Sequence, residues 1–213
     1  RGFDVHRPEA EYNQHMDWTE KFVVEAFEHN HSKAPCFVYV HVNDTHEPFD
    51  PPEPFKSMWG PSYRNKYEGE ISYVDYHLGR VFAAMKRMGI FDDTLIVVFS
   101  DHGTEFSEHG FREKKVNVYN EILHVPLMFH YPKVLPAGHV TNGLCESAQV
   151  APTILDIAGL PPLPRKQAQS PSLLPRLQGK AEGGLEFVVS HTAHEHQKEG
   201  GPLQFEQFAI QTM

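Results

Sequence analysis

Two short clusters of polar residues follow apolar segments of the sequence, and both contain side chains suited to binding a cation or an anion. Residues 43–48 include His46, and residues 100–103 include Asp101 and His102. A carboxylate and an imidazole at neighbouring positions can both reach one divalent cation, and aspartate oxygen favours a hard ion. The alternative is that Asp101 caps the following segment and His102 only forms a hydrogen bond with it. The residue types alone leave both interpretations open.

The elements that would position these clusters alternate between helices and strands. Helical periodicity covers residues 17–29 and 69–88, whereas residues 36–42 and 94–99 are apolar at nearly every position. Continuous apolar strands are typical of a parallel sheet that is buried on both faces. Weaker patterns predict a helix at 147–158 and strands at 125–130, 187–190 and 208–212.

The predicted fold is therefore α/β, with a mostly parallel sheet flanked by helices. In open sheets of this kind, ligands bind beyond the carboxyl ends of the strands. We expect both polar clusters to lie at that edge and to converge on one pocket.

Smaller expectations concern the start of the first helix, the cysteines and one histidine. Asp17 and Glu20 have the spacing of a capping box at the start of the first helix. Cys36 lies in an apolar run and is interpreted as a buried thiol, and His41 is interpreted as a core residue of the same strand. The sequence contains 2 cysteines, too few for a disulfide framework.

Charge and hydropathy exclude some classes of partner. The 213 residues carry a formal charge of −9 without a basic stripe, so nucleic acid is not an expected partner. No apolar run approaches the roughly 18 residues that span a bilayer. An acidic chain can still bind an anionic substrate where a metal ion and a few cationic side chains converge.

The order of several motifs resembles the C-terminal half of the catalytic domain in the sulfatase family, which belongs to the alkaline-phosphatase-like superfamily. His-x-Pro occurs at residues 46–48, and Gly-Glu-Ile-x-Tyr-Val-Asp occurs at residues 69–75. Ser-Asp-His-Gly-x-Glu and Glu-His-Gly follow at 100–105 and 108–110. Lys115 precedes Pro126 in the register of the family's lysine. The similarity continues through residues 151–160 and 172–175, and it covers roughly residues 18–212.

The resemblance implies a role for each matching residue. Asp101 and His102 would be ligands of one divalent cation, with Ca²⁺ expected and Mn²⁺ or Zn²⁺ as alternatives. His46 and Lys115 would be catalytic and substrate-binding residues. The alternatives are that His46 is a turn residue bonded to a local carbonyl oxygen and that Lys115 is a solvated surface charge. Cleavage of a sulfate ester places negative charge on the leaving oxygen, which a cation, an ammonium group and an imidazole donor can stabilise. His109 would lie behind the metal ligands or in a loop.

The family's nucleophile is a formylglycine formed from Cys or Ser in Cys/Ser-x-Pro-x-Arg. Neither Cys36 nor Cys145 lies in such a motif, so the resemblance places the nucleophile and further metal ligands upstream. Residues 1–213 are thus expected to be part of a single catalytic domain, without its nucleophile-bearing part and its C-terminal subdomain, and inactive alone. Gln149 stands where the family often has Asp, a change expected to affect a helix cap.

The implied function is hydrolysis of sulfate monoesters on small molecules or glycans. The alternatives within the superfamily are a phosphodiester or phosphonate hydrolase and a phosphoethanolamine or phosphoglycerol transferase. An alternative of another class is a non-catalytic sulfatase-like binding protein. The resemblance also favours an extracytoplasmic location, and it leaves the oligomeric state and the natural substrate open.

Overall fold

The structure is a computed structural model. It describes residues 16–30, 35–110, 112–113, 117–164, 170–181, 184–194 and 205–212. The chain divides into two compact units, Arg1–Asp92 and Asp93–Met213, and each is described by itself. None of the helices in the described ranges combines the length and the apolar character needed to cross a bilayer.

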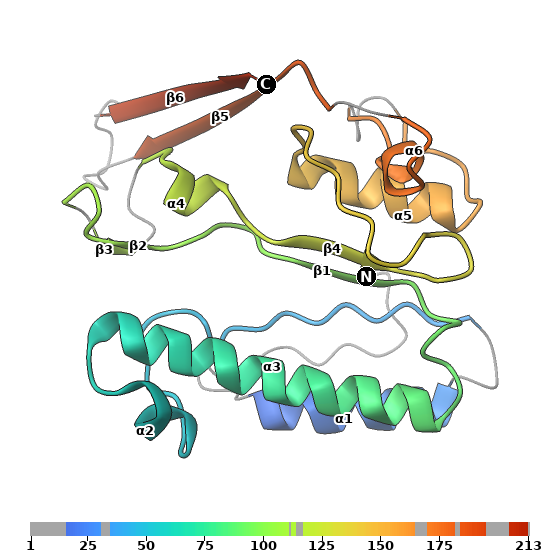
Figure 1. Cartoon of the computed structure of the whole chain (residues 1–213), viewed down its shortest axis with the longest axis horizontal. Helices are drawn as coiled ribbons and strands as arrows, with labels where there is room; N and C mark the ends of the chain where they lie inside the picture. The colour runs from blue at the N-terminus through green and yellow to red at the C-terminus, as the bar shows by residue number, and fades with distance from the viewer. Residues whose placement is uncertain are drawn as a thin grey trace, which may run out of the picture. The chain divides into compact units, whose positions relative to one another are not determined.

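The first unit contains the helices α1 (Met16–Asn30), α2 (Phe55–Trp59) and α3 (Tyr63–Arg87). The long helices α1 and α3 pack side by side (Figure 1). Helix α3 begins six residues before the predicted start, because the Ser62 hydroxyl accepts a hydrogen bond from the Asn65 amide (3.1 Å) and caps it. Gly89 follows the helix with a φ of 71°, which agrees with its expected role as the stop.

The apolar periodicity of α3 predicts a buried stripe that includes Ile71, Val81 and Met85, and the structure confirms it only in the C-terminal part, where Val81 and Met85 are buried. The N-terminal part of α3 buries Glu70, Tyr73 and His77, whereas Ile71 is 39% exposed. The prediction of a capping box at Glu20 is wrong, because the Glu20 carboxylate accepts hydrogen bonds from α3 instead. These polar side chains can be buried because they have hydrogen-bond partners: Glu20 of α1 for His77, and the Asp50 amide of the loop before α2 for Glu70.

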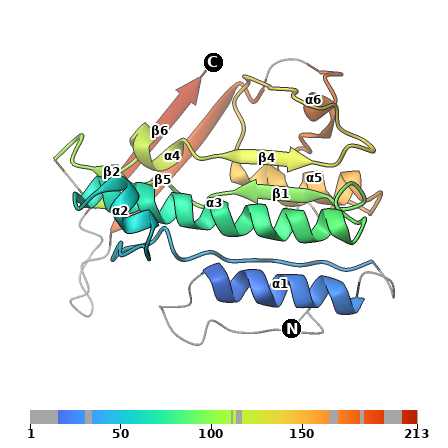
Figure 2. The same cartoon turned by 60° about the horizontal axis from the view of Figure 1, so that its bottom comes forward.

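Residues 36–42 follow an extended path along α1 and α3 but do not form the predicted buried strand (Figures 1 and 2). A strand is defined by its ladder, and none of the ladders formed by the described residues includes this segment. The side chains of Phe37 and Tyr39 are accordingly 63% and 62% exposed. Cys36 and His41 are exposed too, so the predictions of a buried thiol and a core histidine are wrong.

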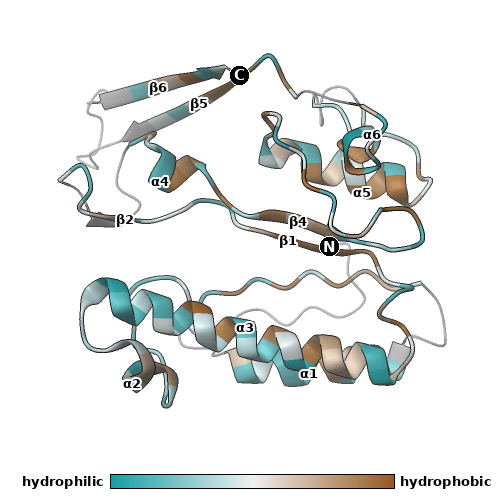
Figure 3. Ribbon diagram, in the orientation of Figure 1, coloured by the Kyte–Doolittle hydropathy of each residue, from teal (hydrophilic) through white to brown (hydrophobic). Residues whose placement is uncertain are grey.

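The second unit contains three two-stranded antiparallel sheets within its described residues. Strand β1 (Ile96–Phe99) pairs with β4 (Leu127–His130), and both are strongly hydrophobic (Figure 3). Short strands β2 (Glu105–Phe106) and β3 (Arg112–Glu113) form the second sheet, and β5 (Phe187–His194) and β6 (Phe205–Thr212) form the third. The predicted strands at 94–99, 125–130, 187–190 and 208–212 are therefore present. The parallel pairing expected around β1 is not formed by the described strands.

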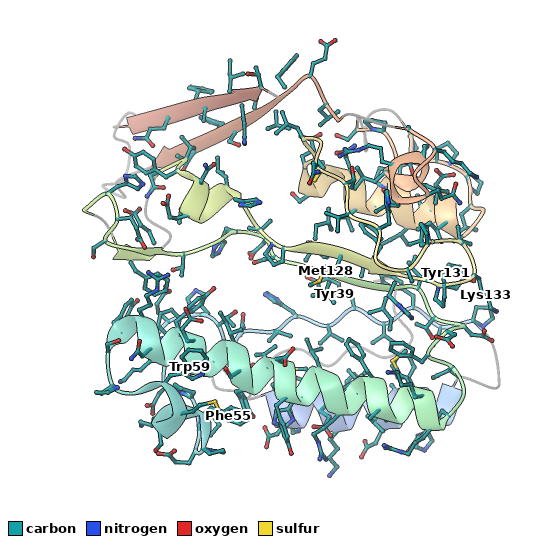
Figure 4. All side chains as sticks on the ribbon, viewed as in Figure 1. Tyr39, Phe55, Trp59, Met128, Tyr131 and Lys133 are labelled. Atoms are coloured by element: carbon teal, nitrogen blue, oxygen red, sulfur yellow. The ribbon has the colours of Figure 1, made fainter. Side chains whose placement is uncertain are left out.

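Short helices complete the second unit: α4 (Asn120–Leu123), the 3₁₀ helix η1 (Ser147–Gln149), α5 (Val150–Ile157) and α6 (Leu174–Leu177). The predicted helix at 147–158 is confirmed as η1 followed by α5. Gln149 takes part in a cap, because its side-chain oxygen accepts a hydrogen bond from the Glu146 amide (3.1 Å). Lys133, after β4, pairs with Asp93 at 2.7 Å (Figure 4).

Candidate functional site

The Asp101–His102 pair begins two residues after the end of β1, as the sequence predicted. The Ser100 amide donates a hydrogen bond to the carbonyl oxygen of Pro126 (3.4 Å), just before β4. The Ser100 hydroxyl donates a hydrogen bond to the His102 carbonyl oxygen (2.7 Å). These bonds turn the chain at the strand end and hold the backbone on both sides of Asp101.

Gly103 fixes the backbone immediately after the pair. Its amide donates a hydrogen bond to the Ile122 carbonyl oxygen in α4 (2.8 Å). A Cβ atom at position 103 would lie 2.0 Å from the carbonyl oxygen of Glu121, a distance that no side chain tolerates. Glycine is therefore required because of this close approach of two backbones.

The two side chains present ligand atoms to the same place. Asp101 Oδ1 accepts a hydrogen bond from the His102 amide (3.0 Å), and Asp101 Oδ2 lies 3.7 Å from His102 Nε2. His102 Nδ1 lies 2.8 Å from the Gly103 carbonyl oxygen. A carbonyl oxygen only accepts, so Nδ1 carries the proton and Nε2 of the neutral ring has the lone pair that a metal needs.

This pair fits a divalent cation. Ligand oxygens lie about 2.4 Å from Ca²⁺, so two atoms separated by 3.7 Å are within reach of one ion. The Asp101 side chain is 79% exposed and therefore accessible. No group of three or more His, Cys, Asp or Glu side chains gathers into a metal site within the described ranges. Among the described residues, Asp101 and His102 could together offer two ligand atoms, and the metal-binding role expected of them from the sequence stays a prediction.

A network of contacts around the buried Glu105 follows the pair, and the sequence reasoning did not predict its partners. Glu105 is fully buried and accepts hydrogen bonds from the His109 amide and the Asn117 side chain, both at 2.7 Å. The His109 ring stacks on Tyr119 with centroids 3.7 Å apart, and its Nε2 lies 3.2 Å from a Glu121 oxygen. His109 is therefore held by neighbouring side chains of this unit. The Glu-His-Gly motif at residues 108–110 was the sequence signal that could have drawn attention to His109.

His46 lies in a turn of the first unit. Its amide donates a hydrogen bond to the Asn43 carbonyl oxygen (2.9 Å), and its Nδ1 donates one to the Glu47 carbonyl oxygen (2.7 Å). The half-buried ring is thus oriented by backbone contacts, and the substrate-binding role expected of it stays a prediction. Asp44, two residues earlier, accepts a hydrogen bond from the Met16 amide at the start of α1 (3.0 Å).

The structure brings together only some of the predicted site residues. Asp101 and His102 form a pair at the end of β1. Lys115 lies outside the described residues. His46 belongs to the first unit and the pair to the second, so their convergence on one pocket stays a prediction.

Comparisons with known proteins define the family. The family model for sulfatases matches residues 4–160, and the chain therefore belongs to the sulfatase family. The N-acetylglucosamine-6-O-sulfatase of Bacteroides thetaiotaomicron is 35% identical over 98 residues, which are 46% of this chain and 17% of that protein.

Two solved structures are similar to the chain. One is a complex with its substrate D-glucosamine-2-N,6-O-disulfate; it has 28% identity and a TM-score of 0.58 over 70% of this chain and 30% of the other. The phosphonate monoester hydrolase of Agrobacterium radiobacter has 23% identity and a TM-score of 0.74 over 92% and 50% of the two chains. The second similarity concerns the fold alone, and it agrees with the predicted alkaline-phosphatase-like α/β class. The chain thus spans half or less of the length of these three proteins.

Proposed function

We propose that this chain is part of an enzyme that hydrolyses sulfate monoesters with the help of one divalent cation. The observation that carries the proposal is the arrangement of Asp101 and His102 at the end of β1. Asp101 Oδ2 and His102 Nε2 lie 3.7 Å apart, and Gly103 anchors the other nitrogen of the ring. Membership of the sulfatase family supplies the reaction class for this arrangement.

Asp101 and His102 would hold the cation as an oxygen and a nitrogen ligand. A bound divalent cation supplies positive charge that stabilises the developing negative charge of sulfate ester cleavage. The backbone bonds around Ser100 and Gly103 fix the two ligands before the cation binds. Such preorganisation lowers the cost of collecting ligands around the ion.

His46 and Lys115 are assigned to the substrate. The ammonium group of Lys115 would contact the oxygens of the sulfuryl group, where a fixed charge favours the transition state. In its protonated form the His46 ring would donate a hydrogen bond from Nε2 to the leaving oxygen, while the bond from Nδ1 to the Glu47 carbonyl oxygen orients the ring. The nucleophile is expected from a part of the longer protein that precedes these residues.

The substrate class that we propose is a sulfated glycan. Two of the comparisons point to sulfated glucosamine: the N-acetylglucosamine-6-O-sulfatase at 35% identity, and the structure in complex with D-glucosamine-2-N,6-O-disulfate at 28% identity. The similarity to the phosphonate monoester hydrolase rests on 23% identity and supports the fold without favouring a phosphonate substrate.

The test uses a longer protein that contains this chain together with the rest of the catalytic domain. Hydrolysis of an aryl sulfate is measured before and after chelation and after addition of Ca²⁺, in the wild type and in Asp101→Asn. Asp93→Asn is the matched control, because Asp93 lies before β1, pairs with Lys133 and is 62% exposed.

We expect cation-dependent turnover that falls at least about 100-fold in Asp101→Asn and is unchanged in Asp93→Asn. Turnover that survives Asp101→Asn, or a wild-type protein that hydrolyses phosphodiesters and not sulfates, would overturn the proposal.

A further inference from the structure

We propose that Gly69 and Glu70 of α3 are positioning residues for His46. They hold the loop of residues 43–51, called here the His46 loop, against α3 in the first unit. This inference rests on the proposed function, in which His46 contacts the leaving oxygen of the substrate. All contacts that carry it lie within the first unit.

Glu70 holds the loop by its backbone. Its side chain is buried, with the residue 4% exposed, and Oε1 accepts a hydrogen bond from the Asp50 amide (2.8 Å). The side chain of Asp50 points to a different partner, because it accepts a hydrogen bond from Lys56 Nζ (2.6 Å). The bond from the Asp50 amide therefore serves to fix the path of the loop, and its removal would leave this amide without its Glu70 acceptor.

Gly69 allows the loop to approach α3. A Cβ atom at position 69 would lie 2.7 Å from Pro51 Cγ and 3.2 Å from the Phe55 carbonyl oxygen. Pro51 is fully buried, so its ring has little room to move away. Any larger residue at position 69 would therefore push the end of the His46 loop off the helix.

His46 lies between two anchored parts of the loop. On one side Asp44 accepts the hydrogen bond from the Met16 amide (3.0 Å). On the other side Phe49 is 4% exposed, and its ring contacts those of Tyr63 and Tyr67 on α3, at centroid distances of 5.1 Å and 5.2 Å. The aromatic contacts and the Glu70 bond hold the same stretch of the loop. Loss of either would allow His46 to shift, and a shift of about 1 Å at a catalytic group can cost about 100-fold in rate.

The Glu70 carboxyl group can accept the hydrogen bond whether it is neutral or charged, and this decides which variants test its role. Burial raises the pKa of Glu70 to about 7, against the lowering effect of the Asp50 amide bond, and the charges of Asp44 and Asp50 raise it further. Other charged and titratable groups lie near these two aspartates. Lys56 of α2 donates a hydrogen bond to Asp50, and Tyr73 of α3 donates one to Asp17. Both the neutral and the charged carboxyl group offer Oε1 as an acceptor. Glutamine keeps such an acceptor, so Glu70→Gln should preserve the bond that Glu70→Ala removes.

The first experiment measures the contact itself. Amide hydrogen exchange at Asp50 is followed in this chain for Glu70→Ala, Glu70→Gln and Gly69→Ala. Gly79→Ala is the matched control on the same helix, because a Cβ atom there meets nothing within 4 Å. We expect exchange at Asp50 at least tenfold faster in Glu70→Ala and Gly69→Ala, and within about threefold of wild type in Glu70→Gln and Gly79→Ala. Unchanged exchange in Glu70→Ala, or equal losses in the alanine and glutamine variants, would overturn the inference.

The second experiment separates this inference from the proposed function. In the longer protein, kcat and KM for an aryl sulfate are measured for the same variants. We expect kcat at least tenfold lower in Glu70→Ala with KM within about threefold, and recovery in Glu70→Gln. If the wild-type protein hydrolyses the aryl sulfate and Glu70→Ala has the same kcat, the positioning role of Glu70 is contradicted and the proposed function is not. If Glu70→Ala speeds exchange at Asp50 but the longer wild-type protein has no sulfatase activity, the proposed function is contradicted. The contact between Glu70 and the His46 loop is then still supported.

Discussion

The carboxylate of Glu20 on α1 lies 2.5 Å from Nδ1 of His77 on α3, and both side chains are nearly buried. The same carboxylate accepts hydrogen bonds from Arg80 Nε at 2.8 Å and 2.9 Å. One acidic side chain thus joins the two long helices that carry the first unit. The His77 side chain is nearly buried, whereas the Arg80 side chain is mostly exposed, and this difference leads to a prediction.

Glu20→Ala should destabilise the first unit more than Arg80→Ala does. Removal of Glu20 leaves the buried His77 without its carboxylate, which should cost about 2–3 kcal/mol in the free energy of unfolding. The Arg80 side chain is 55% exposed, so its loss should cost less than about 1 kcal/mol. Urea unfolding followed by tryptophan fluorescence reports on this unit, because both tryptophans, Trp18 and Trp59, belong to it. A larger loss in Arg80→Ala would contradict this account.

Gly103→Ala should disrupt the turn that carries Asp101 and His102. The added methyl group would meet the Glu121 carbonyl oxygen at 2.0 Å, and a backbone atom cannot rotate away as a side chain does. We expect a loss of stability of at least about 2 kcal/mol and weakened protection of the amide at position 103 in hydrogen exchange. Gly79→Ala is the control and should be neutral or slightly stabilising, since alanine favours a helix by up to about 1 kcal/mol. Full protection of the amide at position 103 in the alanine variant would contradict the close contact between this turn and α4.

Glu70→Gln should change how the stability of the first unit depends on pH. The pKa of Glu70 is raised from 4.5 to about 7 in the folded state, so between these values the folded state binds more protons than the unfolded state. Stability therefore falls as pH rises through this window. A neutral glutamine avoids that loss, so the variant should be more stable than wild type by up to about 3 kcal/mol above pH 8, and similar to it near pH 4. Urea unfolding at several pH values, followed by tryptophan fluorescence, tests this, and a pH-independent difference would contradict it.

Sequence reasoning located the strand end at Asp101–His102 because a strongly apolar run followed by Ser-Asp-His-Gly is a local pattern. It could not find the interactions that cross the fold. The buried stripe of Glu70 and His77 depends on partners 20 and 57 residues away, at Asp50 and Glu20. An apolar periodicity indicates which residues gain from burial, but it does not reveal polar residues whose partners make burial possible.

The extended residues 36–42 illustrate a second limit. Their apolar pattern predicts a buried strand, yet the strand state depends on neighbouring segments, and the described residues provide no ladder to them. The pattern around Cys36 and His41 was therefore interpreted correctly as apolar and extended, but wrongly as buried. Glycines show the same dependence on context, since only the structure distinguishes the crowded Gly69 from the open Gly79.

The central claim is most directly tested by comparing turnover of a matched aryl sulfate and aryl phosphodiester in the longer protein, with and without Lys115→Ala. Lys115 stands in the sulfatase register of the sequence, and a fixed ammonium charge should favour transfer of the sulfuryl group. We predict that the sulfate ester is the better substrate and that Lys115→Ala lowers kcat for it by about 100-fold or more. Preferred turnover of the phosphodiester, or unchanged sulfate turnover in Lys115→Ala, would contradict the account.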